Sequence, residues 1–155
     1  MKRSQAVRAI VAAWLVVGVL DITSAFVIAT IKGTGSIRML QGIASGLLGR
    51  QSLEGGLATA GMGLAIHFFI ALVVVSVFYL ASRKISFLTE QPLVSGLFYG
   101  IAVYLVMYWF VVPLAIPVAR HSVSRDVTAI IIHIVLIGLP TTLVISHFSK
   151  QSSNS

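Results

Sequence analysis

The sequence predicts an all-α fold: a four-helix transmembrane bundle with an amphipathic interfacial helix between the first and second spans. Hydrophobic residues make up 57% of the chain and charged residues only 10%, whereas soluble domains carry about 25% charged residues. Four apolar runs each reach the roughly 20 residues that a helix needs to cross a bilayer. None of them alternates apolar and polar residues as a β-barrel strand does. Helices would therefore satisfy the backbone hydrogen bonds within the membrane.

The four runs predict spans at residues 9–31, 59–82, 91–116 and 127–147. The connections between the second, third and fourth spans are short, which makes neighbouring helices antiparallel. These elements predict a single membrane domain that includes the whole chain.

The link between the first two spans is longer and contains one more predicted helix. Within residues 36–49, apolar side chains recur at helical spacing opposite polar ones. This pattern is typical of an amphipathic helix, and the segment is too short to cross a bilayer. We expect it to lie along the membrane surface or to cap the bundle. The serine-rich tail at residues 150–155 is predicted to be disordered.

The net charge of +7 indicates orientation rather than a nucleic-acid partner. Basic residues are scattered among the tails and connections instead of clustering with aromatic residues on one surface, so no nucleic-acid binding is expected. Lys2, Arg3 and Arg8 precede the first span, and Arg83 and Lys84 follow the second. The positive-inside rule then places both termini in the cytoplasm.

Asp21 is the most informative residue, because it lies near the middle of the first predicted span. A carboxyl group at that depth costs roughly 2.5–3.5 kcal/mol on insertion scales. Gly18, Ser24 and Ala25 lie one turn away on the same face, and small residues allow another helix to approach closely. We therefore expect Asp21 to face the bundle interior or an oligomer interface. The chain is expected to self-associate or to join a membrane complex.

Two histidines also lie within apolar runs, His67 in the second predicted span and His133 in the fourth. With both termini in the cytoplasm, both histidines fall about 4–6 Å into the outer half of the bilayer, and Asp21 falls just past the midplane in the same half. These three residues are therefore predicted to form one polar intramembrane site. The remaining candidates are hydroxyl-bearing side chains nearby in the predicted helices: Ser24, Tyr104 and Tyr108.

Glycines and prolines within the spans predict how the helices pack and bend. Small residues at a helix interface allow two backbones to come close, whereas a proline frees a backbone carbonyl and bends the helix. The predicted packing residues are Gly18, Gly63, Gly96 and Gly100, and the predicted bends are at Pro113 and Pro140.

The polar residues allow three interpretations. Asp21, His67 and His133 could be interhelical hydrogen-bond partners that only orient the bundle, each contact contributing about 0.6 kcal/mol on average. They could instead line a pathway for a proton, an ion or a small solute, because ionisable groups inside membranes often mark such routes. The third interpretation is a b-type haem held by the two histidines, or a metal held by the histidines and the aspartate.

No pattern in the sequence predicts an enzyme. The chain has no cysteine, which excludes disulfides, thiol catalysis and cysteine-ligated metal sites. It also lacks the glycine-rich phosphate-binding, zinc-protease and serine-hydrolase motifs. We therefore expect a non-enzymatic membrane protein with no resident cofactor.

Four segments resemble a widespread group of small bacterial inner-membrane proteins of unknown function: LDITSAF (20–26), IRMLQGIASGLLG (37–49), GGLATAGMGLAIHFFIA (55–71) and SGLFYGIAVYLVMYWFVVPL (95–114). More distantly, three features are similar to YagU-type membrane proteins: a histidine early in one span, a proline late in the next span, and the histidine of IIIHIVLIGLP (130–140). The resemblance implies a bacterial cytoplasmic membrane location and a polytopic fold. It implies no particular activity.

Overall fold

The computed structural model describes residues 3–115 and 122–153, and every regular element in this part of the chain is helical. The elements in chain order are α1 (Arg3–Ile31), α2 (Ser36–Leu48), η1 (Gly49–Glu54), α3 (Gly56–Ser82), α4 (Phe87–Glu90), α5 (Pro92–Val106), η2 (Met107–Val111), α6 (Val112–Ala115), α7 (Val123–Ile132), η3 (His133–Gly138) and α8 (Leu139–Ser153).

Four helical stretches in the described residues are long and apolar enough to cross a membrane, which indicates a multi-pass membrane protein. They are Arg3–Ile31, Gly56–Ser82, Pro92–Leu114 and Val123–Gln151. The structure therefore confirms the predicted four-helix, all-α class. The observed ends differ from the predicted ones by a few residues, because the polar first and last turns remain helical beyond the apolar runs.

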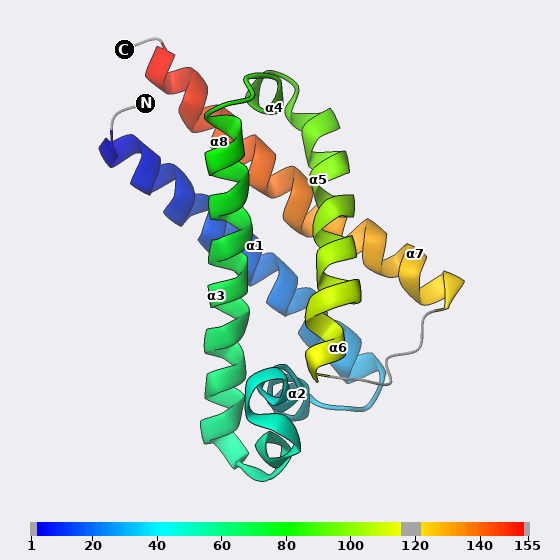
Figure 1. Ribbon diagram of the computed structural model, residues 1–155. Coiled ribbons are helices and arrows are strands. Elements are labelled where there is room, and N and C mark those ends of the chain that lie inside the picture. Colours follow the sequence, from blue (N-terminus) through cyan, green and yellow to red (C-terminus); the bar gives the residue numbers. More distant parts are fainter. Residues whose placement is uncertain (1–2, 116–121, 154–155) are drawn as a thin grey trace.

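The helices form a bundle whose two described ends lie on the same side (Figure 1). In this view α3 and α5 stand upright, while α1 and the α7–α8 rod cross them at an angle. The α1 helix contacts α3 and α8, and α5 contacts η3 and α8. The short α4 turn lies at the end where the termini lie, and α2 and α6 lie at the other end (Figure 1). An even number of spans accounts for the shared side of the two ends.

Both predicted bends coincide with a change in helix type just before the proline. The η2 and η3 segments are π-helical, and they end shortly before Pro113 and Pro140 respectively. A proline cannot donate a backbone hydrogen bond, and its ring clashes with the carbonyl four residues earlier. A wider π turn relieves that clash by inserting one residue into the turn. Each proline thus follows a local widening of its own span.

The amphipathic segment is present as α2, and it caps the bundle against α3 and α6. One polar residue of the amphipathic pattern is nevertheless buried. Gln41 is 5% exposed, and its Nε2 donates to the Gly56 carbonyl at 3.1 Å. The apolar Ile37 and Leu47 are exposed instead. Beside hydrocarbon, burying a hydrogen-bonded amide stabilises a helix more than burying a leucine, because an unpaired amide in an apolar environment is costly.

The predicted disordered tail covers residues 150–155, and the structure describes the first four of them as helix. The α8 helix continues to Ser153, and residues 154–155 lie outside the described residues. Composition predicted disorder from the serines. Ser149 and Ser153 nonetheless extend an existing helix, and extension costs less than starting a new one.

The third and fourth spans pack backbone to backbone through glycines. A methyl group on Gly100 would lie 2.5 Å from the Ile134 Cα and 2.8 Å from the His133 carbonyl oxygen. A methyl group on Gly96 would lie 2.8 Å from the Thr142 hydroxyl, and one on Gly138 would overlap the backbone of α5. The predicted packing glycines of the third span therefore lie where only hydrogen fits.

Candidate functional site

The structure brings Asp21 and His67 together between α1 and α3. Oδ2 of Asp21 lies 3.9 Å from Nδ1 of His67, and the other ring nitrogen, Nε2, lies 3.1 Å from the Gly18 carbonyl oxygen. The Asp21 side chain is 27% exposed and that of His67 is 12% exposed. The pair is thus enclosed on most sides, while the carboxylate remains accessible.

These contacts define which nitrogen of His67 carries a hydrogen. A backbone carbonyl only accepts hydrogen bonds, so Nε2 must donate to Gly18. Nδ1 then faces the Asp21 carboxyl group at 3.9 Å, and the two form an ion pair when the ring is protonated. In that protonated form the pair is imidazolium with carboxylate, and its net charge is zero.

A reciprocal contact one turn away fixes the same two helices. Nε1 of Trp14 on α1 donates to the Phe68 carbonyl on α3 at 2.7 Å, and the two rings meet edge to face. A methyl group on Gly18 would lie 2.6 Å from the Phe68 ring, so the glycine at this predicted packing position makes room for it. Each helix therefore donates one side-chain hydrogen bond to the backbone of the other.

His133, the third predicted ionisable residue, begins η3 on the fourth span and is 8% exposed. Its Nδ1 lies 2.8 Å from the Ala129 carbonyl oxygen of the preceding turn, so Nδ1 is the donor. In the neutral ring Nε2 then carries a lone pair and can only accept a hydrogen bond.

The three hydroxyl candidates lie beside the site without facing its interior. Ser24 donates to the Asp21 backbone carbonyl at 2.8 Å, within its own helix. The rings of Tyr104 and Tyr108 each contact the His133 ring edge to face, and the Tyr104 hydroxyl is hydrogen-bonded to Asp126. Ser24 therefore contacts only the backbone of Asp21 in these bonds, and the two tyrosine rings pack against His133.

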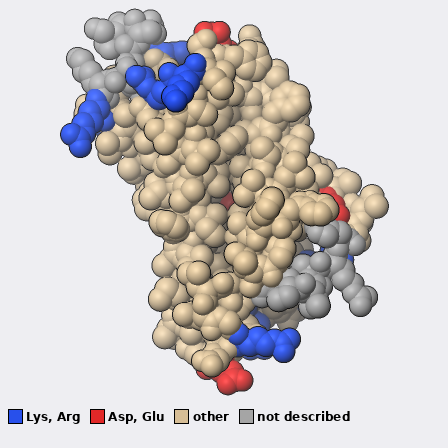
Figure 2. Space-filling view, viewed as in Figure 1, with Lys and Arg blue, Asp and Glu red and all other residues tan. Residues whose placement is uncertain are grey.

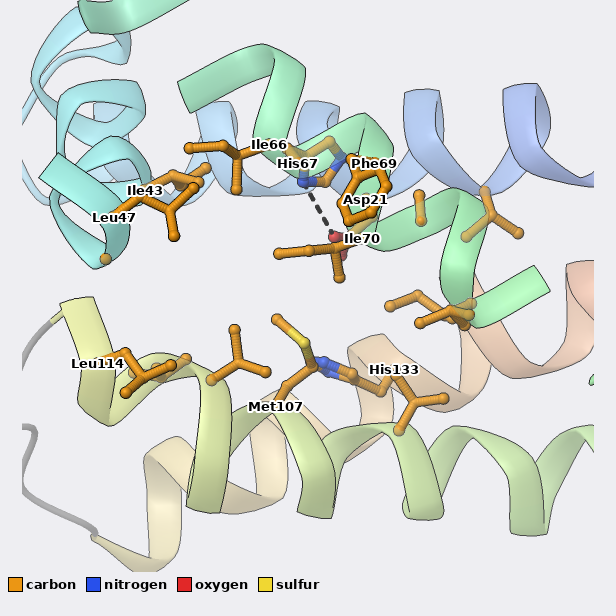
Figure 3. Close-up of a pocket in the computed structure, with 18 residues that line it drawn as sticks. Asp21, Ile43, Leu47, Ile66, His67, Phe69, Ile70, Met107, Leu114 and His133 are labelled. Carbon is orange, nitrogen blue, oxygen red and sulfur yellow. Dashed lines mark ion pairs between the residues drawn. The ribbon is translucent and has the colours of Figure 1, made fainter. Parts of the chain in front are cut away.

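Asp21, His67 and His133 all line one cavity of about 320 Å³. Figure 3 shows Asp21 and His67 on one wall and His133 with Met107 on the opposite wall. Both π-helical segments contribute to the lining, η2 through Met107 and η3 through His133. The remaining lining is almost wholly apolar: Val17, Ile43, Gly46, Leu47, Ile66, Phe69, Ile70, Ala71, Val74, Val103, Val111, Val112, Leu114 and Ile137.

The cavity opens on the side of the bundle, part-way along the four apolar helical stretches. Figure 2 shows charged side chains at the top, the bottom and the right-hand edge of the molecule, and a hollow in the middle of the face with an acidic group set back in it. The three ionisable residues each lie ten or eleven residues from the helix end nearest α2. At 1.5 Å per residue that distance is about 15–17 Å. The outermost lining side chains, Leu47, Phe69 and Leu114, are exposed.

Gly63, the remaining predicted packing residue, does not contact another span. A methyl group there would overlap the Leu40 backbone of α2, which lies directly on this part of α3. The close approach holds α2 against the cavity, to which α2 contributes Ile43 and Leu47. Sequence reasoning missed this role, because it compared Gly63 only with the other spans.

Sequence reasoning also missed Trp14 and Met107. Trp14 was not among the predicted site residues. Its distance of four residues from Gly18 was the available signal, since the two share a helix face. Nothing in the sequence indicated that Met107 would lie opposite Asp21, because that depends on the π-helical turn of η2.

The fold and the apolar spans place the chain among multi-pass membrane proteins with an all-α bundle. The chain matches no protein-family model, no curated protein and no solved structure. The resemblance to small bacterial inner-membrane proteins and to the YagU type therefore stays a prediction. In the described residues no three His, Asp or Glu side chains are grouped as a metal site.

Proposed function

We propose that this chain is a non-enzymatic protein of the bacterial cytoplasmic membrane, with both termini in the cytoplasm, whose Asp21–His67 pair exchanges a proton as a solute enters the cavity. The observation that carries the proposal is the position of the pair: it forms part of the cavity wall and is not sealed between helices. A site of this kind belongs to a permeation pathway, the second of the three interpretations of the sequence.

Charge balance explains why proton and solute would be linked. An unpaired charge inside a membrane is costly, so a buried carboxylate requires a partner. The proton that Asp21 and His67 hold between them supplies this balance. If the proton leaves, the pair carries one negative charge, and something positive must enter the cavity. Occupancy of the cavity and of the proton site are therefore coupled.

The structural interpretation explains less of the geometry. The bonds from His67 to Gly18 and from Trp14 to Phe68 do hold α1 against α3. Such bonds require neither a cavity nor an accessible carboxylate, and both are present at Asp21.

The geometry also disfavours a haem between His67 and His133. Both ring nitrogens of His67 already face oxygen atoms, so an iron ligand would have to give up one of these contacts. An absorbance spectrum of the purified protein tests this directly, because a bis-histidine haem gives an intense Soret band.

A four-helix chain is small for a complete pathway, and we propose that a second copy or another membrane protein completes it. The exposed apolar side chains of the spans otherwise face the lipid bilayer. Crosslinking in native membranes, followed by mass measurement, identifies which of the two partners is present. A chain that stays monomeric under all crosslinking conditions would contradict this part of the proposal.

The test is proton flux into liposomes that contain the purified protein without solute, because an empty cavity leaves the proton site free to load from one side and unload to the other. A potassium diffusion potential drives protons inward, and a pH-sensitive dye in the lumen reports their arrival. We expect flux with the wild type and its loss with Asp21→Asn and with His67→Ala. The matched control is Glu90→Gln, which removes an exposed carboxylate at the end of α4. Equal flux in all four proteins would overturn the proposal.

A further inference from the structure

We propose that the cavity binds a small hydrophobic cation that carries N–H donors, a substituted ammonium or guanidinium, and that this cation replaces the proton held by Asp21 and His67. The inference rests on the proposed function and names the class of ligand that the same site would take. It follows from which polar atoms remain available in the cavity.

The available polar atoms are acceptors on opposite walls. The Asp21 carboxylate is accessible and accepts only. On the facing wall, Nδ1 of His133 is used in the bond to Ala129, so Nε2 of the neutral ring accepts as well. His67 offers no further donor, because Nε2 is bonded to Gly18 and Nδ1 faces Asp21. A ligand that satisfies this site must donate hydrogen bonds.

The size and lining of the cavity restrict the part of the ligand that carries no hydrogen-bond donors. Its volume of about 320 Å³ lies at the low end of the range for small-molecule sites. Apart from the three ionisable residues the lining is apolar, and the opening faces the side of the bundle, where lipid would lie. A ligand with one compact polar group and a short hydrophobic body fits both the walls and the route of entry.

A cation fits better than a neutral donor because of the charge that the proton leaves behind. When Nδ1 of His67 gives up its proton to solvent, Asp21 stays as a carboxylate beside a neutral ring. A ligand cation that pairs with the carboxylate returns the site to zero net charge. A guanidinium group can also form two parallel bonds to a carboxylate. One proton therefore leaves for each cation that binds.

The other groups around His67 do not alter this balance. Of the elements that line the cavity, α1 contributes the ionisable Asp21 and η3 contributes His133. The α2, α5, η2 and α6 residues that line it are apolar or glycine. Tyr108 of η2 contacts the His133 ring without lining the cavity. Competition at the site is therefore between the ligand cation and one proton.

The experiment is calorimetric titration of the full chain in lipid nanodiscs with benzylguanidinium, which stays charged throughout the physiological pH range. Benzylurea is the neutral comparison probe, because it has a similar shape and keeps N–H donors on both nitrogens, while a carbonyl oxygen replaces the third nitrogen and the charge is absent. Repeating the titration in buffers with different ionisation enthalpies counts the protons released. We expect benzylguanidinium to bind about 10- to 100-fold more tightly than benzylurea. We also expect release of close to one proton per bound cation and weaker binding as the pH is lowered.

Three variants assign the effect to particular residues. Asp21→Asn should lose the preference for the cation, whereas Asp21→Glu should retain it and so exclude misfolding as the cause. His67→Gln should still bind the cation but release no proton. His133→Ala should weaken binding about tenfold with proton release unchanged. Glu90→Gln should behave as the wild type.

The outcomes separate this inference from the proposed function. Equal affinity for the two probes, cation binding that survives in Asp21→Asn, or binding without proton release would each overturn the ligand class. If proton flux in liposomes still required Asp21 and His67, the proposed function would stand without it. If neither cation binding with proton release nor Asp21-dependent proton flux were observed, the ligand class and the proposed function would both be overturned.

Discussion

The two helix interfaces that flank the cavity are built in different ways. Between the third and fourth spans, Gly96, Gly100 and Gly138 bring two backbones into direct contact. Between α1 and α3, the contacts include hydrogen bonds from Trp14 and His67 to opposing carbonyls. Direct backbone contact at glycines fixes the distance between two helices. A histidine beside a carboxylate, in contrast, can gain or lose a proton without any movement of the backbone. In the proposed function, the first interface fixes the cavity and the second responds to the solute that enters it.

The largest expected effect is at the glycine interface. Gly100→Ala would place a methyl group 2.5 Å from the Ile134 Cα, so the two spans would have to separate. We expect the free energy of unfolding to fall by about 3 kcal/mol, measured by titration with sodium dodecyl sulfate in bicelles. Gly61→Ala is the control, since a methyl group there meets nothing within 4 Å. Equal stability of both variants would contradict the backbone contact.

A smaller loss is expected where α2 lies on α3. Gly63→Ala would force the Leu40 backbone away, and we expect a loss of about 2 kcal/mol because α2 has fewer contacts to give up than a whole span. Hydrogen–deuterium exchange of α2 should rise more than exchange of α5. Unchanged exchange in α2 would mean that α2 does not depend on this contact.

The polar interface should tolerate the loss of one bond. Trp14→Phe keeps an aromatic ring against Phe68 but removes the donor to its carbonyl. We expect a loss of about 1 kcal/mol in the same unfolding titration. Proton flux should persist, because Asp21 and His67 remain. If flux disappeared while stability was retained, the role assigned to Trp14 would be wrong.

The smallest effects compare two neighbouring hydroxyl groups on α8. Thr142 donates to the Pro92 carbonyl at 2.8 Å, so Thr142→Val should lose about 0.6 kcal/mol. Thr141 is fully buried, and its hydroxyl has no hydrogen-bond partner in the described residues. Thr141→Val should therefore be neutral or stabilising. Unfolding titrations that rank the two variants in the opposite order would contradict these assignments.

The sequence was sufficient for the fold and for part of the site's geometry. Apolar length predicted four spans, helical spacing predicted α2, and depth along the helices predicted that Asp21 and His67 lie at one level. These features depend on local pattern and on the thickness of a bilayer. The predicted orientation, oligomer and bacterial location depend on surroundings outside the chain and stay predictions.

The parts that the sequence did not reveal depend on how side chains meet in three dimensions. Pro113 and Pro140 indicated bends, but not the π-helical turns that place Met107 and His133 at the cavity. The burial of Gln41 depends on the Gly56 carbonyl, which only the folded link brings within reach. The cavity itself is space left unfilled by packing, and no residue pattern encodes it.

The most direct test of the central claim is a nitrogen NMR measurement on His67 in nanodiscs, because the shifts of Nδ1 and Nε2 report which of them carries a hydrogen. The structure predicts that Nε2 keeps its hydrogen under all conditions, held by the Gly18 carbonyl. It further predicts that benzylguanidinium, added at a pH where Nδ1 also carries one, removes the hydrogen from Nδ1. The central claim would be contradicted if Nε2 of His67 carried no hydrogen. It would also be contradicted if Nδ1 kept its hydrogen when benzylguanidinium binds.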